Sequence, residues 1–146
     1  MKVYADNPKA GFNYEILETI EAGLVLKGYE VKAIKSGRAV INGSYVKIIS
    51  GYPVLIGATI APYQPANTPE SYDPQASRKI LISKAEINRL IGIQQSQGSA
   101  LIPLKLFDKK GLVKLLIGIA RGKKKYDKRE TIKKKDEQRR KQRGLS

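Results

Sequence analysis

The chain of 146 residues has the length of one compact domain with a short extension. It carries 28 Lys and Arg against 13 Asp and Glu, a formal net charge of +15, and contains no His, Cys or Trp. These absences exclude a Ser-His-Asp or Cys-His nucleophile, a disulfide framework and a zinc site built from His or Cys ligands.

The positive charge favours a polyanion as partner, and nucleic acid is the first candidate. The first residues lack the apolar run of a secretory signal, and no stretch of the sequence reaches the length of a membrane span. We therefore expect a soluble, cytoplasmic monomer that binds nucleic acid and has no membrane partner.

The charge is concentrated at the C-terminal end. Residues 121–146 hold thirteen basic and four acidic residues, a net +9, which leaves +6 for residues 1–120. From residue 122 onwards the only aliphatic residues are Ile132 and Leu145, too little apolar surface to offset the entropy lost on ordering. We predict a folded body, residues 1–121, and a basic tail, residues 122–146, that is disordered when free and helical when bound to a polyanion.

The first half of the body has the pattern of strands around one short helix. Residues 14–20 are β-like and residues 23–26 are apolar, which predicts two strands or one long bent strand. Residues 29–36 carry apolar positions three apart among charged ones, which predicts a short amphipathic helix that ends at Gly37. Residues 44–49 and 53–60 are β-branched runs separated by Ser-Gly, the pattern of a hairpin.

The second half predicts a loop, a helix and a second hairpin. Four prolines within residues 61–77 indicate a surface loop without regular structure. Residues 83–86 match a capping box, and the apolar spacing that follows predicts a helix with one buried stripe. Residues 101–107 and 112–120 read as strands joined by residues 108–111, with Gly111 in the left-handed position of a hairpin with a bulge.

These elements predict a fold that is mainly β with short helices, an α+β class. About seven short strands and two helices in roughly 120 residues are typical of a small closed or nearly closed β-barrel of the oligonucleotide-binding kind. The pattern does not determine the order of the strands.

Motifs for catalysis are lacking. No acidic cluster has the spacing of metal ligands, and no glycine-rich phosphate loop occurs. Glu15, Glu18 and Glu21 could be read as a cation site, but a solvated strand edge is the simpler interpretation. We therefore expect no enzymatic activity, catalytic residue, metal or cofactor, and rank a carboxylate-metal nuclease below an RNA-binding protein.

Basic residues beside an aromatic ring suit RNA, because the ammonium groups hold phosphates while the ring stacks on a base. Residues 122–129 show this pattern around Tyr126, although a solubilising tail would also be basic. In the body, Arg78, Lys79 and Lys84 cluster near a helix start, where they could contact phosphates. Glu21 could either pair with a lysine or accept hydrogen bonds from base edges.

Several motifs in one order resemble the SsrA-binding protein family, also called small protein B, the partner of transfer-messenger RNA. The similarity runs from Asn7 to Arg129. Its blocks include Asn7-Pro8-Lys9-Ala10, Glu21-Ala22-Gly23-Leu24, Ser44-Tyr45-Val46, Arg78-Lys79-Ile80-Leu81-Ile82, Pro103-Leu104-Lys105-Leu106-Phe107 and Gly118-Ile119-Ala120-Arg121-Gly122-Lys123.

The resemblance implies a barrel that binds the tRNA-like domain of transfer-messenger RNA and delivers it to stalled ribosomes for trans-translation. The tail would enter the empty mRNA channel, contacting ribosomal RNA there. The RNA-binding candidates are Asn7, Lys9, Glu21, Arg78, Lys79, Leu81, Lys114, Lys123 and Lys124. The ribosome-contacting candidates in the tail are Tyr126, Asp127, Lys128, Arg129, Lys133, Lys134 and Lys135, with Tyr126 near the decoding centre.

Three positions depart from the family pattern. Phe12 follows Gly11 where the family usually has His, so a decoding-centre contact must be stacking by Phe12 or be missing. Gly43 stands where an Asp usually precedes Ser-Tyr-Val, and Ala76 replaces an Arg. The replacement of Arg by Ala76 is expected to remove one phosphate contact. A ribosomal protein or general RNA chaperone with a basic extension is the alternative function.

Overall fold

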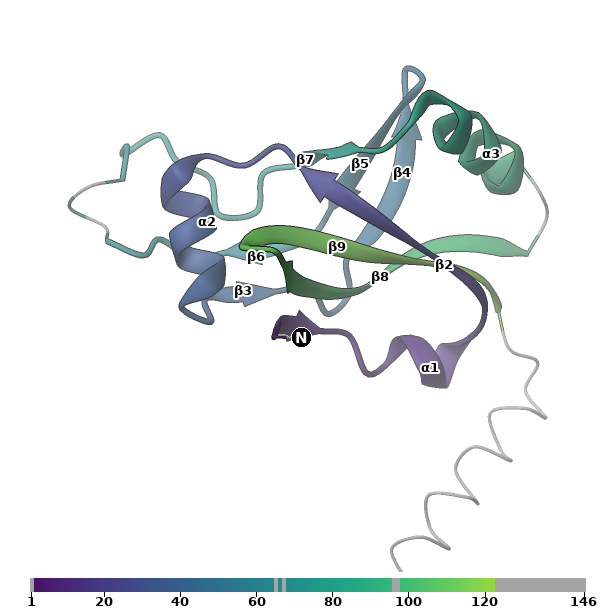
Figure 1. The fold of residues 1–146 in the computed structure, drawn as a ribbon, viewed down its shortest axis with the longest axis horizontal. Helices are drawn as coiled ribbons and strands as arrows, with labels where there is room; N and C mark the ends of the chain where they lie inside the picture. The colour runs from purple at the N-terminus through teal and green to yellow at the C-terminus, as the bar shows by residue number, and fades with distance from the viewer. Residues whose placement is uncertain (1, 65, 67, 96–97, 123–146) are drawn as a thin grey trace, which may run out of the picture.

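A computed structural model describes residues 2–64, 66, 68–95 and 98–122 (Figure 1). The elements in chain order are β1 (Val3–Asp6), α1 (Ala10–Asn13), β2 (Tyr14–Leu24), α2 (Gly28–Lys35), β3 (Ala39–Val40), β4 (Tyr45–Ile49), β5 (Tyr52–Ile56), β6 (Thr59–Ile60), β7 (Arg78–Leu81), α3 (Lys84–Gln95), β8 (Ser99–Lys109) and β9 (Leu112–Gly122). The chain is mostly β with short helices, as predicted. The candidate tail residues from Lys123 to Lys135 lie outside the described residues.

One antiparallel sheet organises the body. Its seven strands follow the order β1-β8-β9-β2-β7-β5-β4, and β3 pairs with β6 in a separate two-stranded sheet. The long strands β2, β8 and β9 cross the centre of the molecule, with α2 and α3 at opposite ends (Figure 1). Among the described residues, β1 and β4 are the edges of the sheet, so the sheet does not close into the barrel that we expected.

The core lies on the inner face of this sheet. Strand alternation turns Ile20 and Ala22 of β2 and Leu115 of β9 inward, and all three are buried. Ile34 of α2 and Leu90 of α3 are fully buried in the same cluster. The predicted helices are thereby held against the sheet by apolar burial. In the part of the chain that the structure describes, no helix is both long and apolar enough to span a membrane.

Local signals placed several boundaries correctly. Residues 14–24 form one long strand, β2, whose pairing with β9 is irregular between Ile16 and Glu18. The backbone after α2 turns left-handed at Gly37, with φ +83°, as a helix-ending glycine does. At the start of α3, the Glu86 N–H donates to Ser83 Oγ over 3.3 Å, half of the predicted capping box.

Other boundaries were wrong. The run 53–60 is not one strand, because Gly57 adopts φ +85° and separates β5 from β6, which pairs with β3 instead. The sequence also gave no signal for β1, β3, α1 or β7 as separate elements. Strand β7 lies just before the predicted helix start at residues 83–86, and it bridges β2 and β5.

Both predicted hairpins are confirmed, with tighter turns than expected. Ser50 and Gly51 have φ 52° and 81°, and Lys110 and Gly111 have φ 51° and 82°. Two residues with positive φ between paired strands indicate a type I′ turn. The pairing of β8 with β9 continues to Lys109 and Leu112, so the bulge expected beside Gly111 does not form there.

This turn geometry predicts a stabilising substitution. Lysine at a left-handed position is strained, whereas asparagine tolerates it and is favoured in type I′ turns. We expect Lys110→Asn to raise the free energy of unfolding by about 0.5 kcal/mol, measured by urea denaturation. Gly111→Ala is the matched opposite, expected to lower it by about 1 kcal/mol or more. Equal effects of the two variants would contradict the turn assignment.

Candidate nucleic-acid interface

Four candidate residues meet on the outer face of β2, β7 and β9. Gly23 of β2 pairs with Leu81 of β7 on one side and with Lys114 of β9 on the other. Strand alternation turns Glu21 and Lys79 to the same outer face, opposite to the buried core residues. We call Glu21, Gly23, Lys79, Leu81 and Lys114 the strand face.

The middle of the strand face combines an exposed apolar side chain with positive charge. Leu81 is 57% exposed. A Cβ on Gly23 would lie 3.4 Å from Leu81 Cβ and 3.7 Å from Lys114 Nζ, so the lysine and the leucine approach each other over the bare glycine. Among the described residues, the side chains of Lys79 and Lys114 have no hydrogen-bond or ion-pair partner. Their charges are therefore available to phosphates, and Leu81 to the apolar part of a base or sugar.

The glutamates of β2 are paired with protein cations. Glu15 pairs with Arg121 over 2.7 Å, Glu18 with Arg89 of α3, and Glu21 with Lys109 of β8. Glu21 was expected either to pair with a lysine or to accept hydrogen bonds from bases, and in the structure it pairs with a lysine. Within the residues that the structure describes, no three acidic side chains gather as metal ligands would. Glu15, Glu18 and Glu21 therefore do not form the cation site that their spacing allowed.

The Glu18–Arg89 pair predicts a titration shift. The hydrogen bond from Arg89 lowers the pKa of the Glu18 carboxyl, and the bond to Glu18 raises the pKa of Arg89. Because the folded-state pKa is lowered, the stabilisation from this pair is present above the ordinary Glu pKa. It is lost as the pH falls through the lowered value.

We expect Arg89→Met to return the pKa of Glu18 to its ordinary range, which carboxyl NMR titration would detect. Stability near neutral pH should change little, since both side chains are about half exposed and solvent screens the pair. An unchanged Glu18 titration in the variant would contradict the pairing.

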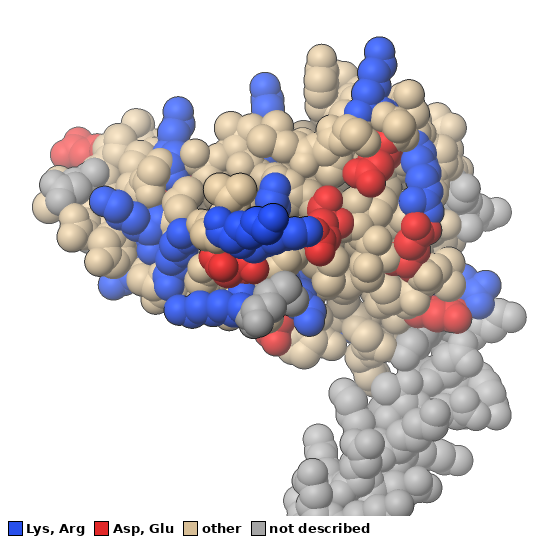
Figure 2. Space-filling model, in the orientation of Figure 1, with Lys and Arg blue, Asp and Glu red and all other residues tan. Residues whose placement is uncertain are grey.

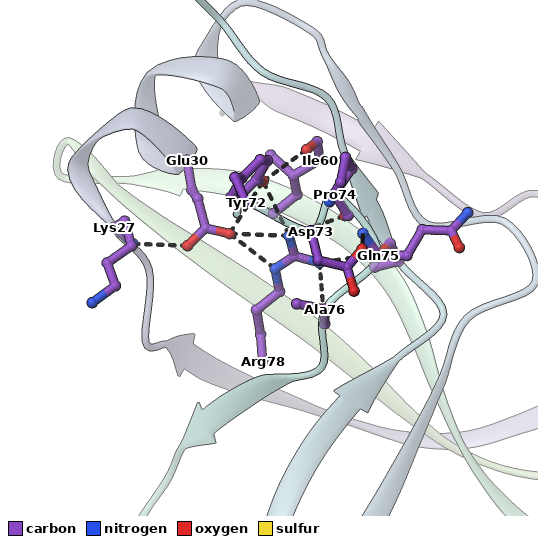
Figure 3. Close-up of polar contacts among 10 residues, drawn as sticks. Lys27, Glu30, Ile60, Tyr72, Asp73, Pro74, Gln75, Ala76 and Arg78 are labelled. Carbon is purple, nitrogen blue, oxygen red and sulfur yellow. Dashed lines mark hydrogen bonds and ion pairs between the residues drawn. The ribbon is translucent and has the colours of Figure 1, made fainter. Parts of the chain in front are cut away.

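Arg78, a predicted phosphate ligand, is instead an internal anchor (Figure 3). It is 4% exposed and pairs with Glu30, which is 7% exposed, over 3.0 Å. The Nε–H donates to Glu30 Oε2, Nη1 donates to the carbonyls of Ala58 and Ala76, and Nη2 donates to Tyr72 Oη and the carbonyl of Pro74. These five hydrogen bonds use all five N–H donors of the guanidinium, so in this fold the side chain has no free donor for a phosphate.

This network holds the end of the proline-rich loop. Tyr72 Oη donates to the carbonyl of Ile60 over 2.7 Å, and burial raises the pKa of its phenol. The Lys27 N–H donates to Glu30 Oε1 over 2.9 Å, joining the start of α2 to the same carboxylate. Residues 72–76 are consequently fixed beside α2 and β7, although the loop has no regular strand or helix there. Position 76, where the family usually has Arg, contributes a carbonyl acceptor here.

Asn7 and Lys9 lie apart from the strand face, near α1. Asn7 is 9% exposed, and its Nδ2 donates to the carbonyl of Pro103 over 3.1 Å. Its amide joins the end of β1 to β8, and Asn7 also lines the groove beside the exposed Lys9. Lys9, Asn13, Tyr14 and Tyr45 line a groove of about 400 Å³ between α1, β4 and β8.

The departures from the family pattern have separate structural settings. Gly43 borders the groove and has φ +78°, a left-handed conformation that glycine adopts without the strain of an aspartate side chain. Phe12 lies in α1 beside Lys9 and Pro8, and is half-buried. Figure 2 shows basic side chains gathered over the α2 side of the front face, with acidic side chains among them.

Sequence reasoning missed Glu30 and Tyr72 as partners of Arg78. The available signal was Glu30 at the third residue of α2, three after Lys27, a position where a glutamate accepts from the helix start. That signal indicates a helix cap and says nothing of a cation 48 residues away. Only the tertiary fold brings the two charges together.

Known proteins similar to this chain agree on one family. The family model described as "SmpB protein" matches residues 4–146. The SsrA-binding protein of Trichodesmium erythraeum is 44% identical over 144 residues, covering 99% of this chain and 92% of the relative. That of Geobacillus thermodenitrificans is 48% identical over 138 residues, covering 94% and 88%.

A solved structure supports the same assignment. Its chain, described under "tmRNA-SmpB: a journey to the center of the bacterial ribosome", is 39% identical with a TM-score of 0.66, covering 87% of this chain and 92% of its own. The match of the family model over nearly the whole chain, together with relatives above 40% identity, shows that the chain belongs to the SmpB family of SsrA-binding proteins.

Proposed function

We propose that this protein binds the tRNA-like domain of transfer-messenger RNA and delivers it to stalled ribosomes for trans-translation. The observation that carries the proposal is the strand face, on which unpartnered Lys79 and Lys114 flank the exposed Leu81 in a chain of the SmpB family. Phosphate contacts from the lysines give affinity, and apolar contact with unstacked bases adds selectivity. Glu21 holds the edge of this face through Lys109.

The tail has a separate role in this proposal. Residues 123–146 stay disordered in the free protein and become helical against ribosomal RNA in a vacant mRNA channel, whereas Gly122, placed in the tail by the sequence, is the last residue of β9. Tyr126, Asp127, Lys128 and Arg129 make the contacts near the decoding centre, and Lys123, Lys124 and Lys133 to Lys135 bind RNA phosphates. A message already in the channel excludes the tail by occupancy. The protein thereby selects ribosomes whose message has run out.

In this proposal the chain is a binding protein of the cytoplasm and not an enzyme. An open sheet with basic residues on its outer face is compatible with an oligonucleotide-binding-like architecture, although β1 and β4 do not pair. The relatives carry the name SsrA-binding protein, and the solved neighbour is described with tmRNA and the ribosome. The alternative, a ribosomal protein or general RNA chaperone, predicts equal affinity for unrelated structured RNAs.

Two substitutions on the strand face test the proposal. We expect Lys114→Ala to weaken binding of the tRNA-like domain about 5-fold to 10-fold and to reduce the slope of log K against log salt by about 1. Leu81→Ala should weaken binding with the salt slope unchanged, because it removes an apolar contact. Filter binding or fluorescence anisotropy over a salt series gives both quantities.

Matched controls are available off the face. Lys32→Ala removes an exposed lysine of α2, and Val40→Ala trims a similarly exposed apolar side chain of β3, so neither should change the affinity. If the face variants and the controls lose affinity alike, or an unrelated structured RNA competes equally well, the chaperone alternative replaces the proposal.

A further inference from the structure

The β4–β5 hairpin presents an exposed aromatic surface that none of the candidate RNA contacts uses. On its outer face Tyr52 is 65% exposed, Tyr45 is 48% exposed and Ile49 is 45% exposed. Ile49 pairs with Tyr52, and Tyr45 pairs with Ile56, so the two tyrosines stand at opposite ends of the same two-stranded ribbon. Side chains of this size are left in solvent although Val46, Pro53 and Leu55 on the opposite face of the same hairpin are buried.

The same surface carries unbalanced positive charge. Lys47 of β4 pairs with Val54 of β5, which pairs with Lys79 of β7, so two lysines flank one apolar residue across three strands. Residues 45–56 and 78–82 contain no acidic residue. Within the described residues, neither the Lys47 nor the Lys79 side chain has a hydrogen-bond or ion-pair partner. The charge therefore favours an anionic ligand over an apolar protein surface.

This surface is continuous with the strand face. Val54 of the hairpin pairs with Lys79 of β7, and Lys79 belongs to the strand face. Leu81, two residues further along β7, pairs with Gly23, and Gly23 pairs with Lys114. Lys79 is thus shared by the two surfaces. At the other end, Tyr45 lines the groove that also holds Lys9.

The backbone edge of β4 is less available than its face. The Ile48 N–H donates to Gln94 Oε1 of α3 over 2.8 Å, which occupies a donor in the middle of this edge strand. A partner that added a strand to β4 would have to displace that bond. The side chains of the outer face need no such rearrangement.

We propose that Tyr45, Lys47, Ile49, Tyr52 and Lys79 form a platform for an unpaired, single-stranded segment of RNA. Bases stack on Tyr52 and Tyr45, which stand at its two ends, and the phosphates between them contact Lys47 and Lys79. Exposed aromatics interleaved with lysines are the combination that binds single strands without sequence preference. The platform extends the proposed function, since it would take unpaired nucleotides beside the tRNA-like domain held on the strand face.

The test uses the full chain and a readout confined to the platform, because the basic tail also attracts RNA. Octauridine and an eight-base-pair RNA duplex are titrated separately while the tyrosine ring resonances are followed by NMR. We expect the rings of Tyr45 and Tyr52 to shift upfield with octauridine and much less with the duplex. Tyr63, an exposed tyrosine of the 61–77 loop, is the internal reference and should not move.

Variants separate stacking from charge. Tyr52→Phe should retain octauridine binding as read at the Tyr45 ring, whereas Tyr52→Ser should weaken it roughly 5-fold to 100-fold. Lys47→Ala should lower the salt dependence of the same shift. Because Tyr52 is mostly exposed to solvent, its replacement should leave the fold intact. Circular dichroism is the check that each variant is folded.

Three results would overturn the platform. These are unshifted tyrosines, equal shifts with octauridine and duplex, and ring shifts that grow with protein concentration in the absence of RNA, which would show a contact between copies of the chain. If octauridine fails to shift the tyrosine rings but Lys114→Ala still weakens binding of the tRNA-like domain, the platform is refuted and the proposed function stands. Loss of the Lys114 and Leu81 effects with an intact platform refutes the proposed function alone.

Discussion

A protein ending at Gly122 is expected to bind transfer-messenger RNA with an affinity within about tenfold of the full chain, yet to tag no nascent peptides. Gly122 is the last residue of β9 and pairs with Tyr14, so the cut keeps the complete β2–β9 ladder and the strand face. The removed residues carry +8 of the net charge of +15 and include every candidate for the mRNA channel. Binding is measured by anisotropy, and tagging in a reconstituted translation reaction stalled on a message without a stop codon.

A charge-reversed full chain is the control for the length of the tail. Lys128→Glu with Arg129→Glu should abolish tagging as truncation does, while leaving the body and its RNA affinity nearly unchanged. Truncated protein that still supports tagging would refute the division of labour between body and tail. A truncation that lost affinity for all RNAs in parallel would indicate a general RNA-binding extension.

Removal of the buried guanidinium should produce the largest loss of stability. We expect Arg78→Met to lower the free energy of unfolding by about 3 to 5 kcal/mol, because it leaves the Glu30 carboxylate buried without its cation. It also removes the donors to the carbonyls of Ala58, Pro74 and Ala76, which then lack their partner. Urea denaturation followed by circular dichroism measures the loss.

The double variant distinguishes a buried charge pair from ordinary packing. Arg78→Met with Glu30→Gln should recover part of the loss, since no uncompensated charge remains. The exposed Glu18–Arg89 pair gives the matched contrast, because Arg89→Met should lower the free energy of unfolding far less. Equal losses at Arg78 and Arg89 would show that the interior pair is not anchoring the loop. RNA binding by Arg78→Met, measured where the variant is folded, should approach that of the unaltered chain.

The contrast between Arg78 and its neighbours shows what a sequence can and cannot predict here. Repeating patterns within a few residues were reliable: the spacing in residues 29–36 and the capping residues 83–86 predicted α2 and α3. Ser50-Gly51 and Gly111 predicted the two hairpins, since positive φ is a local requirement. A charged residue, in contrast, is expected from the sequence to be exposed to solvent. Nothing in the sequence near Arg78 indicates a partner on α2.

Short strands were missed because their stability comes from distant partners. β1 has four residues and pairs with β8 about a hundred residues later, and β7 is a four-residue bridge between β2 and β5. β7 alternates a buried arginine and isoleucine with an exposed lysine and leucine, a pattern that hydrophobicity alone does not identify as a strand.

The candidate site was predicted in part. The resemblance selected Glu21, Leu81 and Lys114, and the fold brings these three residues of separate strands onto one face with Lys79. It also selected Asn7, whose buried amide instead joins β1 to β8. A position associated with RNA binding can act by holding its neighbours, and sequence similarity does not separate that role from direct contact.

The most direct test of the two-part account is to crosslink the full chain in cells, purify it and sequence the attached RNA together with the crosslinked peptides. We predict that transfer-messenger RNA is the major RNA, with crosslinks from its tRNA-like domain to the strand face. Ribosomal RNA crosslinks should fall on residues 123–146. A mixture of unrelated structured RNAs, or tRNA-like crosslinks confined to the tail, would contradict the account.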